Sequence, residues 1–242
     1  MLDINIQTQK SIFANKYTCA LTFSPGEIVA LLGQNGAGKT TLIKEIVGIF
    51  PFCRGEILLD GEPLTQKNLH RIAYGSSENS FFGELTALEQ KEFYQMNFPN
   101  FNEKRFDLLV DYFKLPVNRQ MRYLSQGEKN QLETVFALSQ GADYIFLDEP
   151  FANNDILRRK DFYKLLLGIL EEHECLILIT HLVEEINHLV SRAIYMDNFN
   201  IIDSVNIEEL EDKDMDIVIW FKQKSNYSDN KVSSIIQKLE EN

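Results

Sequence analysis

The sequence has few basic residues for its length. Its 24 Lys and Arg are outnumbered by 36 Asp and Glu, which gives a formal net charge of −12 at neutral pH. Proteins that bind DNA or RNA usually carry a basic stripe, so this balance argues against a nucleic-acid partner. Hydrophobic residues make up 44% of the 242 residues and charged residues 25%, as in ordinary globular proteins. We therefore expect one compact domain with an appendage.

Paired cysteines and long apolar runs are also missing. Cys19, Cys53 and Cys175 are far apart and form no C-x-x-C motif, which is typical of reduced cytosolic thiols rather than of disulfides or a zinc site. The longest apolar stretches, such as residues 165–170, are far too short for a transmembrane helix. Residues 1–10 lack the apolar run of a signal peptide. The sequence thus predicts a cytoplasmic location, with any membrane contact made through another chain.

What the sequence does contain is a phosphate-binding loop. Residues 33–40 match the pattern G-x-x-x-x-G-K-[ST]. A short buried strand is predicted at residues 27–32, before the loop, and an amphipathic helix at residues 41–47, after it. This order aims backbone N–H groups and the positive end of a helix dipole at an anion. The residues expected to hold the nucleotide are Gly33, Gln34, Asn35, Gly36, Ala37, Gly38, Lys39, Thr40 and Thr41.

Two further apolar runs end in polar residues suited to the same chemistry. Residues 144–147 precede Asp148 and Glu149, and residues 175–180 precede His181. Uninterrupted apolar runs between helical patterns indicate parallel strands, and ligands gather beyond the carboxyl ends of such strands. We therefore expect these side chains at the same edge of the sheet as the phosphate loop.

Their expected roles follow from charge. Thr40 and Asp148 offer hard oxygen ligands to Mg²⁺, and Glu149 can orient or deprotonate an attacking water. Lys39 would neutralise the β- and γ-phosphates, and His181 would donate to the γ-phosphate. The ordinary alternatives are that an Asp-Glu pair before proline forms only a turn, and that a lone histidine after a strand is a loop residue. Their place beside a phosphate loop favours the catalytic interpretation.

A fourth motif, Leu-Ser-Gln-Gly-Glu, covers residues 124–128 and precedes an amphipathic helix. Ser125 and Glu128 form a capping box, which by itself would explain these residues. With the phosphate loop before it and Asp148-Glu149 and His181 after it, the chain resembles the ATP-binding cassette of ABC transporters over about residues 1–203.

The resemblance implies an α/β fold: a P-loop NTPase (RecA-like) core with an antiparallel β subdomain and an inserted α-helical subdomain. It also implies ATP and Mg²⁺ as ligands, and a homodimer or heterodimer of cassettes. In such a dimer Ser125 and Gly127 close over the γ-phosphate that the other subunit holds, again with a helix N-terminus facing an anion. A separate transmembrane permease subunit is implied as well.

The helical subdomain is expected at about residues 86–123. A capping pattern at Thr86 opens one helix, and residues 102–115 form a second that Pro116 ends. Aromatic residues in the loop at 81–85, Phe81 and Phe82, are candidates for docking the permease, although packing of one or both in the core is an equal alternative.

Three features depart from the family pattern. Ser77 stands where the family has a metal-bridging glutamine, and Glu78 beside it is a substitute candidate. Asn154, just before Asp155, replaces the usual leucine at the dimer seam. No aromatic residue is clearly assigned to stack on adenine; Phe13 and Tyr17 are the candidates.

Residues 204–242 lie outside the confident resemblance and predict a small βα appendage: a helix at 206–213, a strand at 216–221 and a helix at 229–241.

The favoured function is an Mg²⁺-dependent ATPase subunit that powers an ABC transporter. It is associated with the inner face of the membrane only through the permease. Export is preferred over uptake because residues 81–89 resemble the corresponding stretch of exporters. The alternatives are an ABC ATPase without a membrane partner and a weakly hydrolysing, ATP-dependent dimerisation module.

Overall fold

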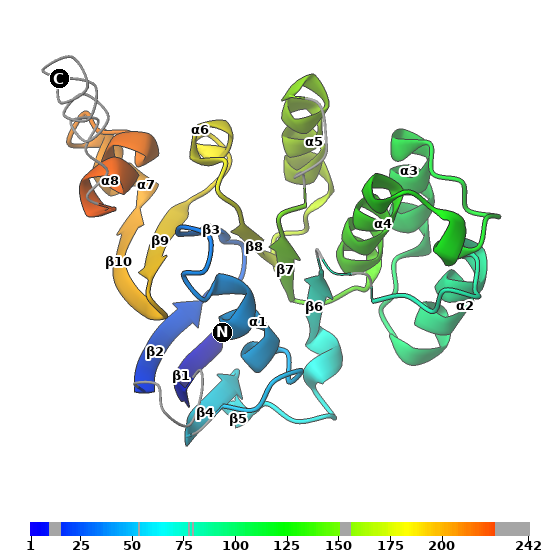
Figure 1. Ribbon diagram of the computed structural model, residues 1–242, viewed down its shortest axis with the longest axis horizontal. Helices are drawn as coiled ribbons and strands as arrows, with labels where there is room; N and C mark the ends of the chain where they lie inside the picture. The colour runs from blue at the N-terminus through cyan, green and yellow to red at the C-terminus, as the bar shows by residue number, and fades with distance from the viewer. Residues whose placement is uncertain (10–15, 53, 77, 79, 151–155, 226–242) are drawn as a thin grey trace, which may run out of the picture.

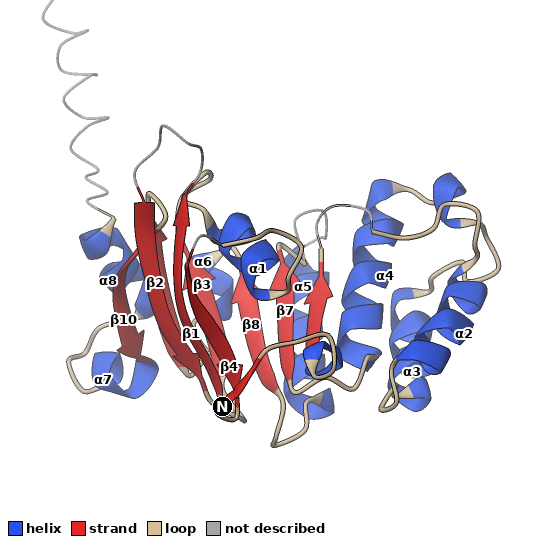
Figure 2. Ribbon diagram, turned by 90° about the horizontal axis from the view of Figure 1, so that it is seen from below, coloured by secondary structure: helices blue, strands red, loops and turns tan. Residues whose placement is uncertain are grey.

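The chain folds around two β-sheets with a group of helices beside them (Figures 1 and 2). The computed structural model describes residues 1–9, 16–52, 54–76, 78, 80–150 and 156–225. The mixed α/β architecture confirms the predicted fold class. Among the described residues no helix is both long and apolar enough to cross a membrane.

The larger sheet has six strands in the order β10-β9-β3-β8-β7-β6. All neighbours pair in parallel except β9 and β10, which pair antiparallel. The central strands β3, β7 and β8 are almost wholly buried, as their uninterrupted apolar runs predict. The strands of this sheet are β3 (Ile28–Leu32), β6 (Ile72–Gly75), β7 (Tyr144–Asp148), β8 (Cys175–Ile179), β9 (Arg192–Asp197) and β10 (Asn200–Asn206).

The register of these strands aligns their carboxyl ends. Ile179 of β8 pairs with Asp148 of β7 on one side and with Leu31 of β3 on the other. The residues that follow the three strands therefore emerge at one edge of the sheet. This pairing brings together loops that are more than 100 residues apart in the sequence.

The smaller sheet is antiparallel, in the order β2-β1-β4-β5. Helix α1 (Lys39–Ile46) packs its apolar residues Leu42, Ile43 and Ile46 into one core with residues of both sheets. Because these three side chains contact residues of both sheets, they hold the start of α1 in place. The strands are β1 (Leu2–Gln9), β2 (Lys16–Phe23), β4 (Arg54–Leu59) and β5 (Glu62–Pro63).

The two helices predicted within residues 86–123 are confirmed as α2 (Ala87–Asn97) and α3 (Glu103–Phe113), which lie beside α4 (Gln126–Ser139) (Figure 1). Capping boxes at Thr86 and Ser125 begin α2 and α4, as the sequence predicts. An aromatic cluster closes this part of the core. Phe136 of α4 is its centre, with ring centroids 4.5 to 5.4 Å from those of Tyr94, Phe106 and Phe81.

The remaining elements connect these parts. They are the short 3₁₀ helices η1 (Leu69–Arg71) and η2 (Met121–Tyr123), and the helices α5 (Ile156–Ile169), α6 (Val183–Ile186), α7 (Ile207–Glu211) and α8 (Ile217–Lys224).

The predicted strand at residues 216–221 is wrong, because this segment forms α8. Asp216 caps the helix by accepting a hydrogen bond from the Ile219 N–H at 2.7 Å. Ile217 and Trp220, three residues apart, are buried, whereas Ile219 is 45% exposed. A short apolar run has no period of its own that separates strand from helix, and here the cap and the one buried face decide. The predicted helix at 206–213 is confirmed as α7, and the helix at 229–241 lies outside the described residues.

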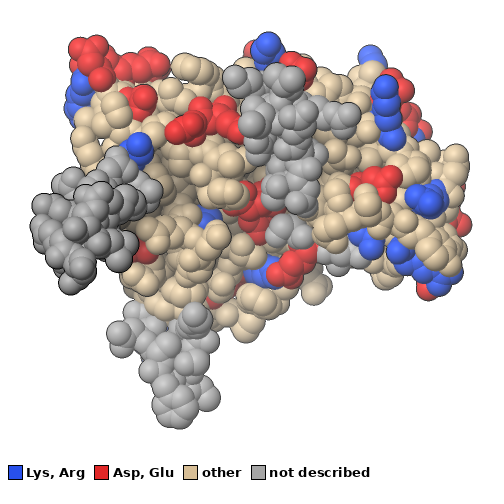
Figure 3. Space-filling view, turned by 45° about the horizontal axis from the view of Figure 1, so that its top comes forward, with Lys and Arg blue, Asp and Glu red and all other residues tan. Residues whose placement is uncertain are grey.

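Charged residues of both signs are mixed on the face of the molecule that Figure 3 shows. On the face in Figure 3, the described Lys and Arg are interspersed with Asp and Glu and form no continuous stripe.

The predicted boundary at 203/204 falls within β10, which continues the larger sheet. Trp220 Nε1 donates to Asp203 Oδ2 at 3.3 Å, so α8 packs directly on this strand.

Candidate nucleotide-binding site

The loop between β3 and α1 is shaped by two glycines in the left-handed region. Gly36 has φ 83° and Gly38 has φ 104°, values that L-residues with a side chain rarely adopt. Gly38 is the N-cap residue of α1 and offers no side-chain hydrogen bond to the helix. The first N–H groups of α1 therefore lack an intrahelical partner and are directed out of the helix end, which suits an anion.

Lys39 lies against the inside of this loop. Its Nζ donates to the carbonyl oxygens of Gly33 at 2.8 Å and Gln34 at 3.1 Å, and the residue is buried. Burial lowers the pKa of the Lys39 ammonium, and the nearby carboxylates of Glu149 and Asp148 partly oppose that shift. The Lys39 ammonium would attract the phosphates of a bound nucleotide, whereas the two carboxylates beside it call for a further cation to accompany those phosphates.

Thr40 and Asp148 join the phosphate loop to the end of β7. Thr40 Oγ1 donates to Asp148 Oδ2 at 2.8 Å, and the Tyr74 hydroxyl donates to the same oxygen at 3.4 Å. Asp148 is 4% exposed, and burial raises its carboxyl pKa, with Glu149 adding to that rise and Thr40 opposing it. A carboxylate destabilised in this way gains from a nearby cation.

This pair fits the magnesium that the sequence predicts here. A hydroxyl and a carboxylate oxygen are hard ligands, and Mg²⁺ is usually held by one or two carboxylates together with substrate phosphates. Within the described part of the chain there is no group of three or more His, Cys, Asp or Glu that could hold a metal. The phosphates of the nucleotide would therefore supply further ligands. Thr40 and Asp148 are therefore the residues that would hold the ion, whose charge would stabilise the phosphate oxygens.

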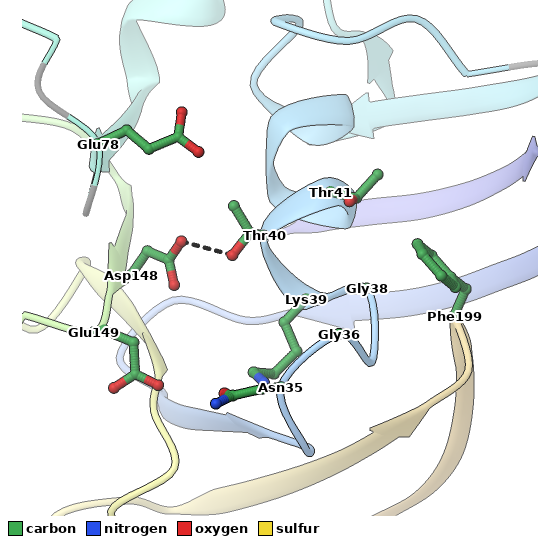
Figure 4. Close-up of a pocket in the computed structure, with 10 residues that line it drawn as sticks. All are labelled: Asn35, Gly36, Gly38, Lys39, Thr40, Thr41, Glu78, Asp148, Glu149 and Phe199. Carbon is green, nitrogen blue, oxygen red and sulfur yellow. Dashed lines mark hydrogen bonds between the residues drawn. The ribbon is translucent and has the colours of Figure 1, made fainter. Parts of the chain in front are cut away.

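Glu149 and His181 form a dyad at the same edge. His181 Nδ1 lies 2.8 Å from Glu149 Oε1, and Thr180 Oγ1 donates to Glu149 Oε2 at 3.3 Å. The Glu149 N–H donates to the Ile179 carbonyl at 2.8 Å, and its φ of 48° is unusual for a residue with a side chain. Both carboxylate oxygens are thus held by neighbours, and Figure 4 shows Glu149 next to Asp148 at the cavity.

Several of these residues line one cavity of about 440 Å³, whereas His181 is not among its described lining residues and meets the site through Glu149. Its described lining is Asn35, Gly36, Gly38, Lys39, Thr40, Thr41, Glu78, Asp148, Glu149 and Phe199 (Figure 4). Most of the residues predicted for phosphate, metal and catalysis are therefore brought together. Gly33, Gln34 and Ala37 support the loop instead: two supply the Lys39 acceptors, and Ala37 is buried.

Two lining residues were not assigned a place by the sequence. Phe199 reaches the cavity from the turn between β9 and β10, and no motif marks it. Glu78 was named only as a substitute for Ser77; its Oε2 pairs with Lys44 Nζ at 2.7 Å. Ser77, Phe13, Asn154 and Asp155 lie outside the described residues.

Ser125 and Gly127 are not part of this cavity. They lie at the start of α4, which belongs to the helical group away from α1 (Figure 1). Ser125 Oγ accepts from the Glu128 N–H at 3.3 Å, and its own N–H donates to Glu128 Oε2 at 2.7 Å. A Cβ added to Gly127 would meet no atom within 4 Å, so this helix start has an open face.

A parallel sheet, a phosphate loop and a hydroxyl–carboxylate pair at one edge define a P-loop nucleotide-binding protein. The sequence also matches the pattern of the family described as ABC transporter over residues 18–152. The chain belongs to this family, as an ATP-binding subunit.

Its relatives include the ABC transporter ATP-binding protein YtrB of Bacillus subtilis (strain 168), with 30% identity over 220 residues, covering 89% of this chain and 75% of that protein. The lipopolysaccharide export system ATP-binding protein LptB of Haemophilus influenzae is 32% identical over 185 residues, covering 72% and 77%. The family match spans the phosphate loop and the Asp148–Glu149 segment.

Solved structures share the fold. An ATP-binding subunit of an ABC transporter superposes with a TM-score of 0.78 at 22% identity, covering 88% of this chain and 92% of that one. The ATP-binding cassette MJ0796, determined as a dimer bound to ADP and Pi, gives a TM-score of 0.73 at 20% identity, covering 86% and 99%. At these identities the likeness establishes the fold alone.

Proposed function

We propose that this chain binds and hydrolyses ATP with Mg²⁺ and so powers transport by a membrane permease. The observation that carries the proposal is Glu149, a carboxylate held by His181 and Thr180 at the edge of the cavity that the phosphate loop lines. A carboxylate held in this way can orient a water and accept its proton, a contribution of roughly 10²–10⁴-fold in rate.

The other residues divide the remaining work. Lys39 and the N–H groups of α1 hold the β- and γ-phosphates. Thr40 and Asp148 would hold a Mg²⁺ ion, which would supply positive charge to the phosphate oxygens. His181 keeps Glu149 in place and donates to the γ-phosphate. The Thr40–Asp148 and His181–Glu149 contacts at this edge support the metal and base assignments.

A second copy completes the site. Ser125 and Gly127 lie at a helix start that is not part of the cavity of their own chain, so they would serve the nucleotide of a partner cassette. The capping box keeps Ser125 at the helix start, and Gly127 leaves room for a close approach. A homodimer is workable because this chain carries both halves of such a site.

The permease would dock on the helical subdomain. Phe82 and Phe93 are 56% and 42% exposed, and their rings meet edge to face at 5.8 Å. Phe81, the other aromatic candidate, packs against Phe136 in the core and is not available. Leu88 is exposed as well, so an apolar patch (Phe82, Leu88 and Phe93) marks this side. The cassette would then lie on the cytoplasmic face of the membrane.

Export is the direction that we favour. Residues 81–89, which include part of this patch, resemble the matching stretch of exporter cassettes, and the LptB relatives are named for an export system. The cassette function is assigned to about residues 1–203, and residues 204–242 are an extension.

Two measurements test the proposal. MgATP turnover by the full chain is compared with that of Glu149→Gln, which keeps the shape but removes the base; we expect turnover to fall at least about a hundredfold while ATP still binds. Equal turnover would refute the catalytic assignment.

Phe82→Asp should abolish co-purification with a polytopic membrane protein, with Tyr123→Asp, another exposed aromatic outside the patch, as the control.

A further inference from the structure

A groove beside His181 is left unused by the roles proposed above. It has a volume of about 450 Å³ and lies between α6 and α8, which pack against each other. The Ile217 N–H at the start of α8 donates to Asn187 Oδ1 at 3.3 Å, so the two walls are joined at one end. The described lining of this groove, called the α6–α8 groove below, is His181, Leu182, Val183, Glu184, Glu185, Val218, Phe221 and Lys222.

The α6–α8 groove has an apolar floor and charged rims. Val183 is buried, and Val218 and Phe221 are half-buried. Glu184 on the α6 side and Lys222 on the α8 side are exposed, so the two rims carry opposite charges. An apolar floor between charged rims is the kind of surface on which an amphipathic helix packs.

Along α8 the groove leads to the end of the described chain. Val218, Phe221 and Lys222 are three and four residues apart, so they share one face of this helix. Ser225, the C-cap and last described residue, is the next position on that face. A chain that turns back after Ser225 enters the groove through residues 226–228, a connection as short as those that ordinarily join two packed helices, roughly 2–8 residues.

The sequence after this connection is complementary to the groove. A helix over residues 229–241, which the sequence predicts, has one apolar face with borders of opposite charge. Lys231 and Lys238 are seven residues apart and lie along one border, and Asp229 and Glu240 lie along the other. The apolar positions, at spacings of three and four residues, are Val232, Ile235, Ile236 and Leu239.

We propose that residues 229–241 turn back along α8 and dock as an amphipathic helix in the α6–α8 groove of their own chain. The apolar face covers the floor of the groove, the lysine border meets Glu184 and the acidic border meets Lys222. Because His181 lines one end of the groove and contacts Glu149, the docked segment packs beside this dyad. The docking itself does not depend on nucleotide chemistry.

Hydrogen–deuterium exchange of the full chain without nucleotide, followed by mass spectrometry, tests this arrangement. It is done at a concentration where light scattering gives the monomer mass of 28.0 kDa. An isolated helix of this length is marginal in water, so protection of its amides reports docking. The amides of residues 229–241 should exchange at least about tenfold more slowly than an unstructured peptide.

Two variants of the segment separate its faces. Ile236→Asp places a charge on the apolar face; it should remove the protection of residues 229–241 and speed exchange in α6. Gln237→Asp introduces the same charge at the next residue, on the opposite side of the helix, and should leave the protection unchanged.

A second pair of variants tests the groove. Val218→Asp, in its lining, should also remove the protection of residues 229–241. Ile219→Asp is the matched control, because this neighbour is 45% exposed and is not among the lining residues. If Val218→Asp does not fold, Glu184→Lys at the exposed rim gives the same readout, because it sets like charges against the lysine border.

The outcomes decide between docking in this groove and the other arrangements. Exchange of residues 229–241 at the unstructured rate in wild type overturns the docking. Protection that survives Ile236→Asp and the groove variant also overturns it, because the segment would then be held elsewhere. Protection that appears only at the dimer mass assigns the segment to a second copy and overturns docking within the chain. Failure of the proposed ATPase function changes none of these results, since no nucleotide is present.

Discussion

Replacement of Glu133 by glutamine should remove a pH dependence of stability that the structure places inside α4. Glu133 is 3% exposed, and its Oε1 accepts from the Ser80 N–H at 2.7 Å and from Ser80 Oγ at 2.6 Å. It thereby fixes α4 to the segment after β6 that carries Glu78 to the cavity. Burial raises the pKa of Glu133 from 4.5 to about 7, although the Ser80 and Ser76 hydrogen bonds oppose that rise.

The magnitude follows from linkage. A folded-state pKa above the unfolded value means that the folded chain binds the proton more tightly, so Glu133 stabilises most below pH 4.5. That contribution to the unfolding free energy is lost as the pH rises towards 7, and above pH 7 it no longer changes with pH. Between pH 5 and pH 8 the loss amounts to about 2 to 3 kcal/mol of unfolding free energy, since each pKa unit corresponds to roughly 1.4 kcal/mol.

Urea unfolding of wild type and Glu133→Gln, followed by circular dichroism at several pH values, measures this loss. The difference in unfolding free energy between the two proteins should change by about 2 to 3 kcal/mol from pH 5 to pH 8, in favour of the variant. A constant cost of the new amide cancels in that comparison. Glu84→Gln, an exposed site, should run parallel to wild type. If the curve of Glu133→Gln is also parallel, the reasoning is refuted.

Two further predictions concern the dyad and a buried ion pair. His181→Ala should lower MgATP turnover at least about tenfold and leave ATP affinity unchanged, because it frees one oxygen of Glu149. The control is His173→Ala, whose side chain is 60% exposed, and it should change neither the turnover nor the affinity. Arg105→Met leaves Glu174, 3% exposed, without its 2.7 Å partner and should cost about 3–5 kcal/mol in urea unfolding, against less than about 1 kcal/mol for Arg122→Met at an exposed pair. A cost below about 1 kcal/mol at Arg105 would show that the pair is not desolvated.

Local patterns explain why so much of the fold could be predicted. Each central strand is an unbroken apolar run with a polar residue directly after it, and parallel pairing brings these ends to one edge. The helix starts at Thr86 and Ser125 were readable because a capping box involves residues only three apart. The phosphate loop likewise contains its own glycines.

Features that depend on distant contacts could not be read in this way. Phe199 meets Gly38 and Tyr17 only after the sheet has formed, and a phenylalanine in a turn gives no sign of the loop that it touches. Phe81 and Phe82 are adjacent and equally apolar, so only the fold decides that the first is buried and the second exposed. The segment 216–221 was mistaken for a strand for a related reason: its helical face is defined by what Trp220 packs against.

The central claim is that ATP joins two copies of this chain, each completing the other's site. Glu149→Gln retains ATP, so its mass by light scattering in MgATP should be about 56 kDa, twice the 28.0 kDa of the chain. The double variant Glu149→Gln, Ser125→Arg should stay at the monomer mass, because the arginine blocks the helix start that faces the partner's nucleotide. A monomer mass for Glu149→Gln with ATP bound would contradict the account.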